Sequence, residues 1–212
     1  DFINKFGYTD HISDFVDMIN KDYLDNPRKL LVEKLHQNMF RKQIIQNIKN
    51  NKFTHLIQNK PRSGKSILML LLSHQFLSQQ KSKVLIMTSV PKTFKSFIKD
   101  LNEYDIFKHI KFEKQDNFLN INEDFNGICF LSTQYLKVNK DNKINHIMKL
   151  KFNAVFIDES DFHSSTDKTD SEIIKKIIGD KGYSIPIIFA SGTATKTREF
   201  YNINPDCVYP WD

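Results

Sequence analysis

The sequence predicts an α/β domain in which a mainly parallel β-sheet is covered by helices on both faces. Two observations carry this prediction: strand-length apolar runs alternate with helical stretches, and the runs are continuously apolar, as burial on both faces requires. The expected strands are 54–57, 84–87, 128–131, 154–157 and 185–189. The expected helices between them are 66–76, 92–101, about 144–150 and 171–178. With 212 residues, the chain has room for one large domain.

The first fifty residues are also expected to be helical. Asn26 and Pro27 suit a helix cap and first turn, and apolar residues recur at roughly helical spacing after them. These apolar residues are Leu30, Leu31, Leu35, Met39, Ile44, Ile45 and Ile48. We therefore expect a helical N-terminal flank over 1–35 and the main domain over 36–212.

Composition favours a globular, intracellular protein. Hydrophobic residues make up 40% of the chain and charged residues 26%, which supplies a core and argues against disorder. No apolar run approaches the ~18 to 20 residues of a membrane span, so no membrane partner is expected. The only cysteines are Cys129 and Cys207, too few for a disulfide scaffold or a four-cysteine zinc site. The first five residues have neither an initiator Met nor a signal-peptide layout, so we expect a cut into a longer polypeptide.

The net charge of +6 has two explanations. A basic chain ordinarily favours an anionic partner such as nucleic acid. However, only four of the 31 basic residues are arginine, and the chain is also rich in Asn and Ile, a bias that an AT-rich genome imposes on neutral surface positions. Charge alone therefore does not decide the partner.

A candidate phosphate-binding loop follows the first expected strand and leads directly into a helix. A phosphate-binding loop needs a Gly where the backbone approaches the phosphates, a Lys for their charge, and a hydroxyl for Mg²⁺. Gly64, Lys65 and Ser66 supply these groups in order. The first glycine of the full pattern is replaced by Asn59, and a chance turn is the alternative interpretation. The residues expected to bind ATP here are Lys60, Pro61, Arg62, Ser63, Gly64, Lys65 and Ser66.

An acidic pair follows the fourth expected strand. Asp158 and Glu159 are costly at the end of a buried strand unless they bind something. In a nucleotide site the first carboxylate holds Mg²⁺ and the second deprotonates the attacking water. We therefore expect Ser66 and Asp158 at the metal, with Glu159 and Lys65 as the catalytic residues. The alternative is an acidic loop in which Asp158 caps a helix.

The fifth expected strand ends in Ser191-Gly192-Thr193-Ala194. Taken alone, these small hydroxyl residues are typical of a turn. Because they follow the acidic motif in the chain, Ser191, Gly192 and Thr193 become candidate functional residues.

Together these motifs resemble the first RecA-like domain of superfamily 2 helicases and translocases. The resemblance covers roughly 36–212 and rests on 61–66, 158–161 and 191–194 as motifs I, II and III. It is closest to the branch that contains restriction-enzyme-type helicase subunits and helicases of large DNA viruses and phages. The resemblance implies a RecA-like P-loop fold, ATP and Mg²⁺ as cofactors, and a nucleic acid as partner.

The resemblance implies that Ser191, Gly192 and Thr193 of motif III couple nucleotide hydrolysis to action on the nucleic acid. It also implies roles for weaker motifs. Gln43 looks like the glutamine that reads adenine, although its spacing to the phosphate loop is only approximate. Polar residues after the second and third strands resemble segments that contact a nucleic-acid backbone, with ordinary polar loops as the alternative. These residues are Thr88, Ser89, Pro91, Lys92, Ser132, Thr133 and Gln134.

The expected function is that of an N-terminal motor lobe in a nucleic-acid-dependent ATPase, either a helicase or a translocase. DNA is favoured over RNA as the nucleic acid. The residues after motif III are too few to form a second RecA-like lobe, so we expect that lobe elsewhere in the parent chain. Without the arginine finger of that lobe, the isolated chain should be inactive or nearly so. A terminase-type viral packaging ATPase and a non-hydrolysing nucleic-acid-binding module on the same fold are the alternatives.

Overall fold

The protein is described by a computed structural model. The described residues are 28–60, 63–77, 82–89, 91–158, 168–178, 185–192 and 195–211. No helix in this part of the chain is long and apolar enough to cross a membrane.

In the described residues, seven strands form one sheet in the order β3-β4-β2-β5-β6-β1-β7. Every pair of neighbouring strands is parallel. The strands are β1 (Thr54–Asn59), β2 (Lys83–Thr88), β3 (Phe112–Lys114), β4 (Gly127–Ser132), β5 (Ala154–Asp158), β6 (Ile187–Ser191) and β7 (Val208–Trp211). The structure therefore confirms the predicted α/β class with its parallel sheet, and each of the five expected strands is present.

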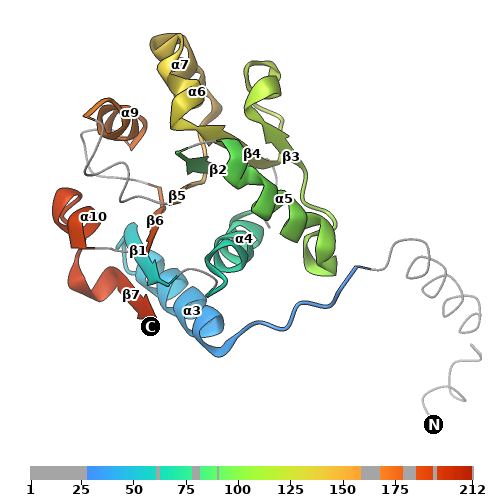
Figure 1. The fold of residues 1–212 in the computed structure, drawn as a ribbon, viewed down its shortest axis with the longest axis vertical. Helices are drawn as coiled ribbons and strands as arrows, with labels where there is room; N and C mark the ends of the chain where they lie inside the picture. The colour runs from blue at the N-terminus through green and yellow to red at the C-terminus, as the bar shows by residue number, and fades with distance from the viewer. Residues whose placement is uncertain are drawn as a thin grey trace, which may run out of the picture.

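Helices cover both faces of the sheet (Figure 1). One face carries α3 (Leu35–Lys49), α4 (Lys65–Phe76) and α5 (Phe94–Glu103), whose apolar side chains form one core cluster with the strands. The opposite face carries α6 (Thr133–Lys137), α7 (Lys140–Leu150) and α9 (Lys168–Ile178), which form the second cluster. The last helix, α10 (Thr195–Phe200), follows β6. Strands covered on both sides explain why the apolar runs are continuous rather than alternating.

The carboxyl ends of the central strands meet at one edge of the sheet. Because all the strands run in the same direction, the residues that close them lie along this edge. These residues are Asn59 of β1, Thr88 of β2, Ser132 of β4, Asp158 of β5 and Ser191 of β6. The sequence motifs singled out above begin at or beside this edge.

The expected helix before residue 35 is wrong in the part that the structure describes. Residues 28–34 are not helical, and Lys29 forms a parallel bridge with Tyr104 instead. The Lys29 amide donates to the Glu103 carbonyl at 2.7 Å, and the Asp105 amide donates to the Lys29 carbonyl at 3.0 Å. This backbone pairing with the end of α5 overrides the local apolar spacing. The expected helix start at Asn26 and Pro27 lies outside the described residues.

Several elements were not predicted from the sequence. They are the edge strands β3 and β7, the short helices α6 and α10, and the 3₁₀ turns Pro91–Thr93, Asp105–Phe107, Gln115–Asn120 and Pro205–Cys207. The strand β7 contains Pro210, which a sheet tolerates at its edge. It is fixed by Tyr209, whose hydroxyl lies 3.0 Å from His55 Nδ1 and accepts a hydrogen bond from Asn47 Nδ2 at 2.9 Å.

Candidate functional site

The candidate phosphate loop turns into α4 at Gly64. Gly64 has φ +92°, a left-handed conformation that glycine adopts without strain, and it caps the helix. Its carbonyl accepts the first helical hydrogen bond from the Leu68 amide at 3.1 Å. Lys65 is the first residue of α4, and Leu68 to Leu72 are buried against the sheet. The helix N-terminus, which favours anions, is thus anchored at the carboxyl edge of the sheet.

Two residues of α3 hold this loop from the side. Gln37 Nε2 donates to the Gly64 carbonyl at 3.0 Å, and His36 Nε2 donates to the Ser63 carbonyl at 3.1 Å. Gln37 is 2% exposed and His36 is 4% exposed. The His36 ring is stacked on Trp211 of β7 with the ring centroids 4.5 Å apart. The loop backbone is therefore tied to α3, and through His36 to the last strand of the sheet.

The lysine of the loop and the first acidic residue lie together. Lys65 Nζ is 3.7 Å from Asp158 Oδ1, although β6 separates β1 from β5 in the sheet. Both side chains are mostly buried, with 19% and 12% exposed, so little solvent screens this pair. Residues 93 positions apart in the sequence thus meet at the carboxyl edge of the sheet, as the two motifs predicted.

The oxygen donors of the site suit Mg²⁺. Ser66 directly follows Lys65 at the start of α4 and is half-buried, and Asp158 closes β5. Mg²⁺ prefers hard oxygen ligands and commonly takes only one or two carboxylates, with phosphate oxygens and water completing its shell. Within the described ranges there is no group of three or more His, Cys, Asp or Glu residues that could hold a metal on its own. A metal that needs the nucleotide phosphates as ligands fits these residues.

Some of the predicted site residues lie outside the described residues, namely Pro61, Arg62, Glu159 and Thr193. Of the others, Lys60 is exposed at the start of the phosphate loop. Ser191 is fully buried at the end of β6, between β5 and β1, and Gly192 is exposed just beyond it. The predicted coupling segment thus starts between β1, which leads into the phosphate loop, and β5, which ends in Asp158.

Gln37, rather than Gln43, is the glutamine that the structure brings to the phosphate loop. Gln43 lies six residues further along α3 and is exposed. Six residues are about one and two-thirds helical turns, so the two side chains leave the helix on different faces. A sequence signal for Gln37 existed, because it falls on the same stripe as Phe40 and Ile44, where a polar residue calls for an explanation.

The segments after β2 and β4 form one surface, since the two strands are paired with Thr88 opposite Ser132. Thr133 Oγ1 donates to the Ser89 carbonyl at 3.3 Å and joins the segments.

Three of the hydroxyl residues predicted to contact nucleic acid here are buried: Thr88, Ser132 and Thr133 are at most 1% exposed. Ser132 Oγ donates to Gln115 Oε1 at 2.8 Å and accepts from the Tyr135 amide at 3.1 Å. These hydroxyls support the surface from within.

The remaining residues of this surface reach solvent. Lys92 and Gln134 are exposed, and Ser89 and Pro91 are half-buried. A lysine and an amide at the edge of the sheet are the side chains that suit contacts to a phosphate backbone.

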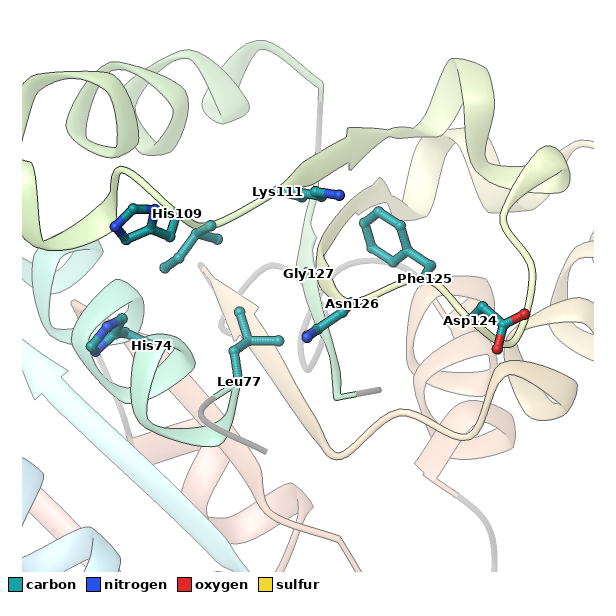
Figure 2. A pocket seen from close by; sticks show the side chains of 9 residues that line it. His74, Leu77, His109, Lys111, Asp124, Phe125, Asn126 and Gly127 are labelled. Atoms are coloured by element: carbon teal, nitrogen blue, oxygen red, sulfur yellow. The ribbon is translucent and has the colours of Figure 1, made fainter. Parts of the chain in front are cut away.

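A shallow pocket at the other end of the sheet is not this site (Figure 2). It lies where β3 and β4 begin, and its cavity volume is about 350 Å³. It is lined by His74, Leu77, His109, Ile110, Lys111, Asp124, Phe125, Asn126 and Gly127. None of the predicted site residues lines it, so this pocket and the predicted chemistry lie at opposite ends of the strands.

Cys129 and His55 are titratable residues buried in the core, away from the predicted chemistry. Burial raises the pKa of the Cys129 thiol to about 12, so this cysteine is a protonated core residue and not a nucleophile. Burial also lowers the pKa of His55 to about 4, so its ring is neutral at pH 7.

Comparisons with known proteins agree with this arrangement. The family model described as "Type III restriction enzyme, res subunit" matches residues 31–194. The SWI2/SNF2 ATPase core of Sulfolobus solfataricus, solved in complex with dsDNA, is similar in structure with a TM-score of 0.63 and 12% identity. That alignment covers 85% of this chain and 37% of the other, so this chain spans little more than a third of that protein. A comparison with curated protein sequences gave no significant match.

The UvsW helicase of bacteriophage T4 is similar to the same extent. Its TM-score is 0.62 at 15% identity, and the alignment covers 97% of this chain and 78% of UvsW. At these identities both structures establish the fold, while the family model covers well over half of the chain. The chain therefore belongs to the family of the type III restriction enzyme res subunit and is a RecA-like domain of the superfamily 2 helicase type.

Proposed function

We propose that this domain binds Mg-ATP and hydrolyses it as the N-terminal motor lobe of a nucleic-acid-dependent helicase or translocase. The single observation that carries the proposal is the 3.7 Å approach of Lys65 Nζ to Asp158 Oδ1 at the carboxyl edge of the sheet. A phosphate-binding lysine and a metal-binding carboxylate must converge in this way for one triphosphate to contact both. Family membership supports the same chemistry, because helicases of this kind generally use ATP and Mg²⁺.

Each residue at the site has a distinct role in the proposal. Lys65 and the backbone amides at the start of α4 bind the phosphates, and Ser66 and Asp158 hold Mg²⁺. When bound, the metal neutralises charge that develops on the transferred phosphoryl group. Glu159 is proposed to orient and deprotonate the attacking water, as the acidic motif predicted.

Gln37, in place of Gln43, is proposed as the glutamine that reads adenine. Its Nε2 is bound to the Gly64 carbonyl, and its Oε1 accepts from the Lys34 amide at 2.9 Å. A glutamine fixed at both ends beside the loop can place the neighbouring nucleotide base, which Gln43, exposed on another face of α3, is not placed to do.

Nucleic acid is proposed to lie along the surface after β2 and β4. Lys92 and Gln134 are exposed there, and the backbone of the two segments is held together by the Thr133 contact to Ser89. Contacts of this type set register without reading bases, so binding should be weak, sequence-independent and strongly salt-dependent. DNA is favoured over RNA, and the Sulfolobus relative, which was solved with dsDNA, supports a nucleic-acid partner.

Nucleotide binding is tested by Lys65→Ala. Removing the charge that faces the phosphates should abolish binding of a fluorescent ATP analogue in the presence of Mg²⁺, while the circular dichroism spectrum stays native. The matched control is Lys95→Ala, which removes an exposed lysine on α5 and should leave the affinity unchanged. Unchanged affinity in a folded Lys65→Ala variant would show that this loop does not bind the nucleotide.

Hydrolysis is tested by Glu159→Gln in the intact protein. The amide can still orient water but cannot accept its proton, so Mg-ATP binding should remain while nucleic-acid-stimulated turnover stops. Turnover at the native rate would remove Glu159 from its role as the base. The variant must be compared in the presence of the second lobe, because an arginine finger supplied by that lobe is worth roughly 10³ to 10⁵ in rate.

A further inference from the structure

Asn59 occupies the position where the phosphate-loop pattern has its first glycine, and the proposed function gives it no role. It is the last residue of β1 and is 1% exposed. Neither its Nδ2 nor its Oδ1 has a hydrogen-bond partner among the residues that the structure describes. Buried carboxamides are almost always hydrogen-bonded, and each exception calls for a reason. A residue that served only to fill this position would be apolar.

The direction of the Asn59 side chain follows from the strand next to it. Asn59 is the register partner of Trp211 in β7, and partners in neighbouring strands point to the same face of a sheet. Trp211 contacts two residues of α3, with its ring 4.5 Å from that of His36 and 6.4 Å from that of Phe40. Asn59 therefore leaves the sheet on the face that α3 covers.

The phosphate loop lies over this same face. The carbonyl of Ser63 receives the His36 hydrogen bond, and the carbonyl of Gly64 receives the Gln37 hydrogen bond. When such a loop turns its N–H groups inward to the phosphates, its carbonyls turn outward and need donors from the protein. His36 and Gln37 supply two of these donors. Asn59 places a further carboxamide, without a partner among the described residues, at the point where β1 enters the loop.

We propose that Asn59 is a positioning residue, whose carboxamide hydrogen-bonds the backbone of the phosphate loop when a nucleotide triphosphate is bound. The inference rests on the proposed function, because it requires that the loop binds nucleotide. It explains why a polar side chain stands where the pattern has glycine, because a hydrogen bond from this side chain would support the loop that holds the phosphates. Asn59 does not touch the reacting atoms and acts through the loop.

Ser82 provides a matched control for this inference. It is also 1% exposed, and its Oγ also has no hydrogen-bond partner among the described residues. It precedes β2, at the opposite edge of the sheet from the phosphate loop. A buried polar group there has the same kind of environment but no access to the nucleotide.

The experiment compares Asn59→Leu, Asn59→Ser and Ser82→Ala with the native protein. Three quantities are measured for each protein: the dissociation constant for Mg-ATP, the dissociation constant for tripolyphosphate, and the melting temperature without nucleotide. Asn59→Leu should raise the dissociation constants for both ligands about tenfold, which corresponds to about 1.4 kcal/mol of binding free energy, without lowering the melting temperature. Asn59→Ser keeps a donor and an acceptor and should recover part of the affinity. Ser82→Ala should change neither affinity.

The outcomes separate this inference from the proposed function. If Lys65→Ala abolishes binding while Asn59→Leu binds like the native protein, the nucleotide site stands and the role of Asn59 is wrong. If Asn59→Leu and Asn59→Ser both lower the melting temperature in proportion to their loss of affinity, Asn59 is a packing residue and the inference is also wrong. If the native protein binds neither ligand, the proposed function fails and the inference fails with it.

Discussion

Replacing Gly64 with alanine tests how the phosphate loop is held. Gly64 has φ +92°, and a Cβ added there would lie 2.5 Å from Gln37 Nε2. An L-residue in a left-handed conformation costs about 1 to 2 kcal/mol. Moving Gln37 aside loses its 3.0 Å hydrogen bond to the Gly64 carbonyl, which contributes about 1 kcal/mol. The lower entropy of the unfolded alanine chain offsets roughly 0.4 to 1 kcal/mol of this loss.

The expected net loss for Gly64→Ala is therefore about 2 kcal/mol of unfolding free energy. For a chain of this length that loss corresponds to a fall of roughly 4 to 8 °C in melting temperature. Urea unfolding followed by circular dichroism measures the free energy, with the slope against urea concentration checked for two-state behaviour. The matched control is Gly192→Ala, because a Cβ there meets nothing within 4 Å among the described residues. Its effect should be within about 0.5 kcal/mol.

A double-mutant cycle with Gln37→Ala separates the two contributions. Once Gln37 is truncated, the added Cβ of Gly64→Ala has no close contact and only the backbone strain remains. The two substitutions should then be non-additive by about 1 kcal/mol. Additivity within 0.3 kcal/mol would refute the reasoning, because it would mean that Gln37 and the loop do not interact as the structure describes.

Three further outcomes are expected. Burial lowers the folded-state pKa of His55 to about 4, so the protein should lose about 3 kcal/mol of unfolding free energy as the pH falls from 6.5 to 4. Chemical unfolding at several pH values measures this loss, which should disappear in His55→Gln and remain in His109→Gln, a control at an exposed site. Phe130→Ala should cost about 3 to 5 kcal/mol of unfolding free energy, because a fully buried ring that contacts three other phenylalanine rings is lost; a cost below 1 kcal/mol would contradict this packing. For binding to single-stranded nucleic acid, Lys92→Ala should reduce the slope of log affinity against log salt concentration by about 0.7, whereas Gln134→Ala should leave this slope unchanged. Equal slopes in the two variants would place Lys92 away from the nucleic acid.

The central strands are predictable from the sequence because strands that are buried on both faces consist of consecutive apolar residues. A strand with helices on both faces must be apolar at every position, so apolar runs such as 84–87 and 154–157 can be recognised as buried strands. The polar residues at their ends, such as Asp158, stand out against these runs. Since parallel strands end at the same edge, the approach of Lys65 to Asp158 follows from the order of the motifs.

Other features depend on contacts that leave little trace in the local sequence. The edge strand β7 is short and contains Pro210, so its local sequence does not predict a strand. It is fixed by the contacts of the Tyr209 hydroxyl with His55 and Asn47, which are far away in the sequence. Residues 28–34 have helical spacing, but they are not helical, and Lys29 pairs with Tyr104 at the end of α5. The choice between Gln37 and Gln43 depends on which face of α3 meets the phosphate loop, and spacing along the chain does not determine that face.

The two outer strands also determine how this sheet meets other molecules. A sheet edge with a long row of unpaired backbone groups invites another chain to add a strand. Here one rim is β3, which is only three residues long, and the other is β7, where Pro210 has no N–H to offer. Both rims are therefore poor templates for strand addition. A partner is left with the ends of the strands and the outer helix surfaces, and this favours docking by side chains and loops over growth of the sheet.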